Sequence, residues 1–243
     1  MHAAIRQWAQ GAVDAVFPPV CVHCQTLVEG SPLRHLCAVC AAKVAMVQPP
    51  CCSTCGHPFY GIVEGERMCP HCEGLAPAFR EGRTCVLLKG PARALVHALK
   101  YHHGLYVLTD MGRIFACSPG LADWVAGANL VPVPLHRRKE RERGFNQSRL
   151  IAETLSRVFG GLEIADVLVR EVDTVSQTHH DKKTRQANLK NAFSLAKGTS
   201  INPARHYILI DDVFTTGSTL NSCALALRRA GCLNLDVITF GHG

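Results

Sequence analysis

The stretch that most constrains the fold of this chain covers residues 207–220, with the sequence YILIDDVFTTGSTL. It opens with a short run of apolar β-forming residues, which switches at once to two acids, Asp211 and Asp212, and then to small hydroxyl residues around Gly217. This pattern predicts a buried strand that enters a loop. After Gly217, apolar residues recur at helical spacing and two arginines occupy the last turn, so we expect the loop to open a helix.

The chemistry of this loop suits a phosphorylated sugar. A helix N-terminus and a hydroxyl-rich turn bring backbone N–H groups and a positive dipole end to one point, which favours a phosphate group. Two carboxylates one sugar length away would accept hydrogen bonds from vicinal hydroxyls. An ordinary strand-to-helix turn uses the same residue types, but the adjacent acids and the uninterrupted hydroxyl-rich turn favour a ligand site. The residues expected to bind a ribose 5′-phosphate are Asp211, Asp212, Thr215, Thr216, Gly217, Ser218 and Thr219.

The same stretch resembles the phosphoribosyl pyrophosphate (PRPP) motif of type I phosphoribosyltransferases. In that motif a hydrophobic strand is followed by two acids, a variable pair and a Thr-Gly-x-Thr turn, and the order here is the same. The resemblance implies that PRPP, accompanied by magnesium, is the ligand.

Composition sets broad limits on the chain. Its 243 residues, 47% of them apolar, are enough for one α/β domain with a small appendage. A net charge of +7 suits anionic partners, either phosphorylated small molecules or nucleic acid. No stretch approaches the about twenty apolar residues of a membrane span, and no secretion signal is present, so a cytoplasmic, non-spanning protein is expected. In a reducing compartment, thirteen cysteines predict metal ligands before disulfides.

Eight cysteines fall in four CxxC pairs. Each pair can form a knuckle whose thiolates bind one ion, so four knuckles predict two closed, structural zinc sites. The simplest pairing joins the first two knuckles and the last two, although the spacing also allows interleaving. Regular spacing favours thiolates over a redox or disulfide set, and over His23, His35, His57 or His71 as replacement ligands. The expected ligands are Cys21, Cys24, Cys37, Cys40, Cys52, Cys55, Cys69 and Cys72.

The remaining patterns predict a domain plan. Apolar residues at three- and four-residue steps before a Pro-Pro pair indicate an amphipathic helix over residues 1–19, followed by a double zinc ribbon over 20–76 and an α/β domain over 77–243. Within the last domain we expect strands near 85–88, 130–135 and 236–240, and helices over 91–101, 106–117 and 148–159. Residues 168–193 predict a long polar loop.

A basic run, HRRKERER, follows the strand predicted at 130–135. Basic runs usually form solvated surface, but this one begins where a strand ends, which is where doubly wound folds bind ligands. If PRPP binds, a pyrophosphate must lie here, and it needs cations. The residues expected to hold it are Pro134, Leu135, His136 and Arg137. We expect the long loop to act as a lid that excludes water.

Taken together, these features resemble the ComF (ComFC-like) family, in which a double zinc ribbon precedes a type I phosphoribosyltransferase domain. The resemblance implies a doubly wound α/β fold with a mainly parallel sheet, and an association with uptake of transforming DNA. One departure is the sequence after Gln177, where Thr178, His179 and His180 replace a more usual Gly-Leu pair. The matching stretches are the CxxC set, Leu99-Lys-Tyr, Val131-Pro-Val-Pro-Leu-His-Arg-Arg, Arg143-Gly-Phe-Asn-Gln, Gln177 with Arg185-x-x-Asn188, Ala192-Phe193 and residues 211–219.

Three hypotheses of function follow. The first is a phosphoribosyltransferase that transfers the sugar from PRPP to an unknown nitrogen acceptor, with Asp211, Asp212, Arg143, Lys182 and Arg185 as catalytic candidates. The alternative is a non-catalytic component of the DNA-uptake machinery, which binds single-stranded DNA through the ribbons and the basic run and contacts other uptake proteins. Its weakness is an aromatic content of only 6%, since base stacking needs aromatic side chains. The third is a catalytically silent sensor of PRPP.

Overall fold

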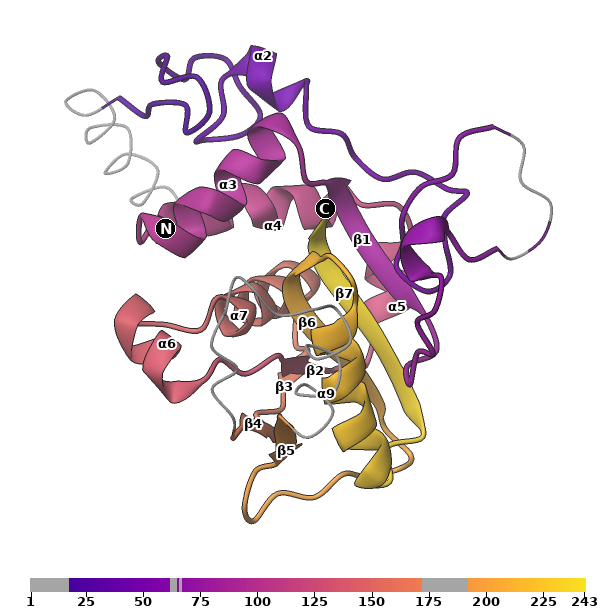
Figure 1. Ribbon diagram of the computed structural model, residues 1–243. Coiled ribbons are helices and arrows are strands. Elements are labelled where there is room, and N and C mark those ends of the chain that lie inside the picture. The colour runs from indigo at the N-terminus through magenta and orange to yellow at the C-terminus, as the bar shows by residue number, and fades with distance from the viewer. Residues whose placement is uncertain (1–17, 62–64, 66, 172–191) are drawn as a thin grey trace, which may run out of the picture.

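The computed structural model describes residues 18–61, 65, 67–171 and 192–243 (Figure 1). Residues 1–17 of the helix predicted over 1–19, and most of the predicted lid, including Lys182 and Arg185, lie outside the described residues. Within the described ranges, no helix has the length and apolar character needed to cross a membrane.

A five-stranded sheet forms the centre of the structure, in the order β1-β7-β6-β2-β3. Every neighbouring pair in it is parallel, which confirms the mainly parallel α/β fold predicted from the sequence. The strands are β1 (Gly82–Leu87), β2 (Asn129–Pro132), β3 (Glu163–Ile164), β6 (His206–Phe214) and β7 (Asn234–His242).

Helices cover both faces of this sheet. Successive strand residues point to opposite faces, so Ile208 and Ile210 of β6 pack with α3, α4 and α7, whereas Leu209 packs with α9 on the other face. The four predicted helices of the domain are present as α3, as η2 followed by α4, as α7 and as α9. The helices are α2 (Ala38–Ala41), η1 (Pro70–Cys72), α3 (Gly90–Tyr101), η2 (Leu105–Val107), α4 (Leu108–Ala116), α5 (Leu121–Val125), α6 (Arg137–Arg143), α7 (Gln147–Phe159) and α9 (Ser218–Arg229).

Two segments differ from the sequence prediction. The basic run forms the helix α6, which has no buried residue. Arg138 and Glu142 form an i, i+4 ion pair on it, with Nε and Oε1 2.9 Å apart, and Gly144 ends it with a φ of +78°. The stretch predicted as a loop over 168–193 begins and ends in antiparallel strands, β4 (Leu168–Arg170) and β5 (Phe193–Leu195). Hydrophobic periodicity did not predict these elements, because α6 has no apolar face and the strands β4 and β5 have only three residues each.

The cysteine-rich segment packs against the α/β domain in two places. Its first part, around α2, lies over α3 and α4 (Figure 1). There the buried carboxylate of Asp110 accepts hydrogen bonds from the backbone N–H groups of Arg34 and His35, both at 2.7 Å. Residues 45–47 then run beside β1, where Val47 N donates to Cys85 O and Leu87 N to Ala45 O. This pairing covers an edge of the sheet that would otherwise expose free backbone groups.

The second part of the cysteine-rich segment meets β1 with almost no space between the two backbones. Gly56 has a φ of +73°, and a Cβ built there would lie 2.5 Å from Thr84 N. Thr84 Oγ1 also donates to Cys55 O at 2.9 Å. The position therefore requires glycine both for its backbone conformation and for its contact.

Replacing Gly56 with alanine should lower the free energy of unfolding by about 3 kcal/mol, because strain and backbone overlap add together. Gly30→Ala is the matched control: Gly30 also has a positive φ, +59°, but an added Cβ would have nothing within 4 Å. Strain alone should cost the control about 1 kcal/mol. Urea denaturation of the zinc-loaded proteins measures both, and equal destabilisation would contradict the close packing of Gly56 on β1.

Candidate functional site

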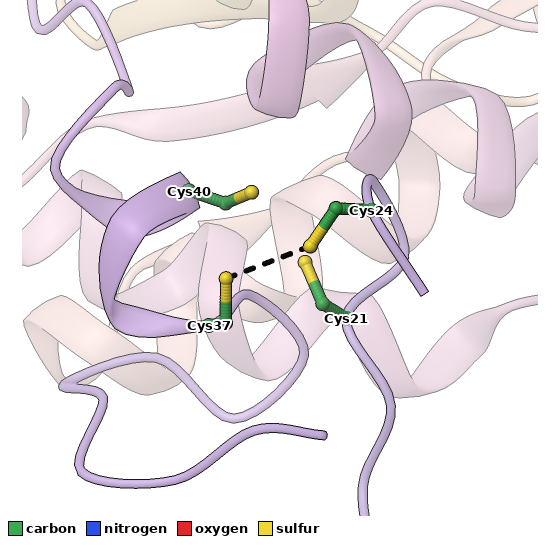
Figure 2. Close-up of side chains that lie close together, drawn as sticks. All are labelled: Cys21, Cys24, Cys37 and Cys40. Atoms are coloured by element: carbon green, nitrogen blue, oxygen red, sulfur yellow. Dashed lines mark hydrogen bonds between the residues drawn. The ribbon is translucent and has the colours of Figure 1, made fainter. Parts of the chain in front are cut away.

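The eight cysteines of the CxxC pairs gather into two clusters. Cys21, Cys24, Cys37 and Cys40 form one, and Cys52, Cys55, Cys69 and Cys72 form the other; in each, the four sulfur atoms lie within 4.8 Å of one another. Figure 2 shows the first cluster, whose four side chains converge from two knuckles. The simple pairing, first two knuckles together and last two together, is therefore confirmed, and interleaving is excluded.

The distances within each cluster fit a tetrahedral zinc ion. With Zn–S bonds of about 2.3 Å, ligand sulfurs should lie about 3.8 Å apart. The Cys24 and Cys37 sulfurs are 3.6 Å apart, and Cys69 and Cys72 are 3.8 Å apart. A disulfide would need about 2.05 Å, and all thirteen cysteines are free. The four histidines considered as replacement ligands lie outside both clusters. Two structural zinc ions are supported, and no coordination position is left open.

The second candidate site lies where β2 and β6 run side by side. The chain leaves β2 toward β3 on one side and leaves β6 toward β7 on the other. This is the topological switch point, the place where open α/β sheets bind ligands beyond the carboxyl ends of their strands. The ends that meet here carry Asp211, Asp212 and the turn 215–219 from β6, and residues 133–137 from β2. The fold thus brings together two of the stretches singled out in the sequence.

Asp211 is held by the beginning of α7. Its Oδ1 accepts hydrogen bonds from Ser148 Oγ and from the backbone N–H of Asp212, both at 2.9 Å. Ser148 is itself positioned by Asn146, whose side chain caps α7 and also donates to Val133 O at 3.0 Å. Burial, and then the charge of Asp212, raise the pKa of Asp211 from its ordinary 3.8 to about 7. A cation or a proton bound at Asp211 would offset the cost of burying this negative charge beside Asp212.

Asp212 is buried, and Lys100 of α3 is its partner. Lys100 Nζ lies 2.8 Å from Asp212 Oδ2, an ion pair. The buried carboxylate therefore has a cation as its partner. Sequence analysis assigned Lys100 no role in a site. The Leu99-Lys-Tyr motif could have suggested one, but only the packing of α3 on the sheet brings this lysine to the acids.

The turn 215–219 leads into α9 through Gly217. This glycine is the N-cap of α9 with a φ of +68°, and it offers no side-chain acceptor to the N–H groups of the first turn. Thr216 Oγ1 and Ser218 Oγ are 2.9 Å apart, and Thr215 and Thr216 are exposed. Beneath the turn, a Cβ on Gly217 would lie 2.6 Å from Phe214 Cζ and 3.0 Å from Leu75 Cδ2. The exposed Thr215 and Thr216 therefore stand beside a tightly packed glycine.

The remaining predicted residues lie on the β2 side. His136 is the N-cap of α6, and Arg137 is its exposed first residue. Pro134 and Leu135 connect the strand to this cap. Arg143, at the end of α6, contacts Gln147 Oε1 in the first turn of α7. Lys182 and Arg185 belong to the part of the chain that the structure does not describe.

Comparison with known proteins gives consistent matches along the chain. The double zinc ribbon domain family matches residues 12–85. "Competence protein F" of Haemophilus influenzae is 28% identical over 221 residues, which are 89% of this chain and 94% of that protein. "DNA utilization protein YhgH" of Escherichia coli K12 is 30% identical over 206 residues, 83% of this chain and 88% of that protein. "Competence protein ComFC" of Bacillus subtilis is 24% identical, over 82% of this chain and 80% of that protein.

Among solved structures, a hypoxanthine phosphoribosyltransferase from Staphylococcus aureus matches 54% of this chain and 61% of its own. The sequences are 18% identical over the match, and the TM-score is 0.34.

Removal of one zinc ligand should cost one ion. Cys55→Ala should retain one zinc ion fewer per chain than the wild type, because three thiolates no longer close the tetrahedral site. Cys51 is the control, since it lies beside Cys52 but outside the cluster. Zinc measured by mass spectrometry after dialysis should be unchanged in Cys51→Ala. A wild-type zinc content in Cys55→Ala would show that this cluster does not bind the metal.

The raised pKa of Asp211 should make stability depend on pH. The folded protein binds this proton more tightly than the unfolded chain does, so the stability that Asp211 contributes is full below pH 3.8 and is lost as the pH rises through about 7. Because acid also releases zinc from thiolates, the comparison is made with Asp211→Asn, which keeps both clusters. Between about pH 8 and pH 6, the wild type should gain stability relative to this variant as the pH falls. A constant difference would contradict the raised pKa.

Proposed function

The chain belongs to the ComF family, which includes the competence proteins and DNA utilization proteins it matches, and we propose that it is a phosphoribosyltransferase acting on PRPP with magnesium. The observation that carries the proposal is the position of Asp211, Asp212 and the turn 215–219 at the β2–β6 switch point. A ribose phosphate needs vicinal carboxylates and backbone donors close together, and these residues supply both.

In this proposal the 5′-phosphate binds in the turn 215–219. It accepts hydrogen bonds from the N–H groups at the start of α9 and from hydroxyls of Thr215, Thr216, Ser218 and Thr219, while Gly217 lets the backbone approach. The ribose hydroxyls donate to Asp211 and Asp212. The raised pKa of Asp211 supports a ligand at these carboxylates.

Magnesium prefers oxygen ligands and usually keeps several waters. Asp211 and Asp212 are the carboxylates that would hold it with PRPP, and there it would neutralise charge on the phosphate oxygens. Asp211 fits such an ion, since its elevated pKa reflects burial and a neighbouring negative charge without full compensation.

The reaction we propose exchanges one bond at C1′ for another. The bond from C1′ to the pyrophosphate oxygen breaks, and its electron pair leaves with pyrophosphate. An acceptor nitrogen donates its lone pair to C1′ and then loses a proton to solvent. C1′ carries positive charge as the first bond breaks, and the carboxylate of Asp212 stabilises this charge electrostatically. No covalent intermediate with the protein is needed.

Cations near the β2–β6 switch point would stabilise the leaving pyrophosphate. Lys100 already lies 2.8 Å from Asp212, and a ligand on that carboxylate would free its ammonium group for phosphate oxygens. His136 and Arg137 follow the end of β2, with Pro134 and Leu135 as their backbone support. Arg143 is a further candidate through its place beside α7, and we assign Lys182 and Arg185 to the lid on the sequence alone.

The alternative function, binding of single-stranded DNA in the uptake machinery, is supported by α6. This helix carries five basic residues and two glutamates, and none of its residues is buried. Names such as competence protein and DNA utilization protein belong to relatives of the chain. We rank this function second because the relatives' names do not identify a binding surface, and α6 alone spans only seven residues.

Calorimetric titration of PRPP with magnesium tests the proposed function. The wild type should bind, and the variant Asp211→Ala, Asp212→Ala should bind at least ~100-fold more weakly, because hydrogen bonds to charged groups contribute ~1.5–3 kcal/mol each. The control removes two exposed acids elsewhere, Glu29→Ala with Asp123→Ala, and should bind as the wild type does.

PRPP titration of the wild type and DNA binding by a variant of α6 separate the two functions. Absence of PRPP binding by the wild type would contradict the proposal. If Arg137→Ala, Arg138→Ala, Lys139→Ala also weakened binding of single-stranded DNA with a smaller salt dependence, the alternative would stand, since each lost phosphate contact lowers the slope by about 0.7.

A further inference from the structure

A group of three histidines lies between the second cysteine cluster and the sheet. His57 and His71 come from the knuckles of that cluster, and His242 is the last residue of β7. The ring centroids are 4.9 Å apart for His57 and His71, 4.8 Å for His57 and His242, and 5.2 Å for His71 and His242. None of the three histidines belongs to the cysteine clusters or to the proposed PRPP site.

These spacings are those of three imidazoles around one metal ion. A metal–nitrogen bond of about 2.0–2.1 Å places each ring centroid about 3.2 Å from the ion, and a tetrahedral angle then separates the centroids by about 5 Å. The ring planes are inclined at 40°, 74° and 65° to one another, and the ring nitrogens do not converge as the cysteine sulfurs do. Metal binding here therefore requires the histidine side chains to rotate.

His242 supplies an independent sign of a missing partner. Its ring is 3% exposed, and its Nε2 is buried with no hydrogen-bond partner. Such an atom costs about 1–3 kcal/mol unless something binds it. A neutral imidazole with an unpartnered nitrogen offers a lone pair, as a metal ligand must.

The backbones of two of the three histidines are already held in place. His57 follows Gly56, whose backbone is pressed against Thr84. His242 lies in a strand, its carbonyl accepts from Leu88 N at 2.7 Å, and its ring stacks on Phe214 with centroids 5.4 Å apart. His71 belongs to the exposed turn η1, so it can move, and it leaves the cluster open to solvent.

We propose that His57, His71 and His242 bind a third divalent transition-metal ion, separate from the two cysteine sites. Three neutral imidazoles suit zinc, cobalt, nickel or copper more than magnesium or calcium. They leave a fourth position for water or an anion. The ion would fasten the second knuckle pair to the ends of β6 and β7, and Phe214 would link it to the turn 215–219 through its contact with Gly217.

The test uses untagged protein that holds zinc in both cysteine clusters. Titration with cobalt(II) should load one further ion per chain. Its visible spectrum should show d–d bands without the thiolate-to-cobalt charge-transfer band that cysteine ligands give. Metal analysis after gel filtration should show one cobalt ion and unchanged zinc. No bound cobalt, or cobalt that appears only with loss of zinc, would overturn the proposal.

Matched histidine variants identify the ligands. His71→Asn changes an exposed side chain and so leaves folding intact, and it should weaken cobalt binding at least ~10-fold; with His242→Asn added, binding should vanish. His97→Asn is the control, because His97 is exposed on α3 and belongs to a different ring cluster. Equal cobalt binding by His71→Asn, His242→Asn and by the control would show adventitious binding elsewhere and overturn the site.

Discussion

The parallel pairing of β2 with β6 is the constraint on which the rest of the structure depends. It aligns Leu130 with Ile208 and continues through the bond from Val133 N to Ile210 O, 3.0 Å long. Both strands therefore end at the same level, with their following helices diverging to either side. Asn146 then fixes the start of α7 to β2, and Ser148 fixes Asp211 to α7. The meeting of the acids with the start of the basic run is a consequence of this one register.

The zinc ribbons extend this arrangement to the edges of the sheet. Zinc binding is coupled to folding in such sites, so we expect it to favour the contacts of Asp110 with Arg34 and His35 and the pairing of residues 45–47 with β1. The second ribbon also reaches the proposed phosphate turn. Asn221 of α9 accepts from Ala78 N and donates to Ala76 O, just after the last cysteine knuckle. The cysteine clusters and the turn 215–219 are thus parts of one packed unit.

Features formed by residues close together in the sequence could be predicted, whereas contacts between distant segments could not. The acids and turn at 211–219 and the four CxxC pairs are local patterns, so the strand, the loop, the helix and the metal clusters could be predicted from their spacing. The pairing of Lys100 with Asp212, and the meeting of His57 and His71 with His242, join segments far apart in the chain and follow only from the packing of the sheet. The helix α6 was not predicted, because a helix without a buried face has no apolar periodicity.

The most direct test of the central claim is a crystal structure of the zinc-loaded protein with PRPP and magnesium. We expect the 5′-phosphate in the turn 215–219, the ribose hydroxyls on Asp211 and Asp212, and the pyrophosphate toward His136 and Arg137. PRPP bound elsewhere, or no ligand at the β2–β6 switch point at saturating PRPP, would contradict its assignment as a phosphoribosyl site.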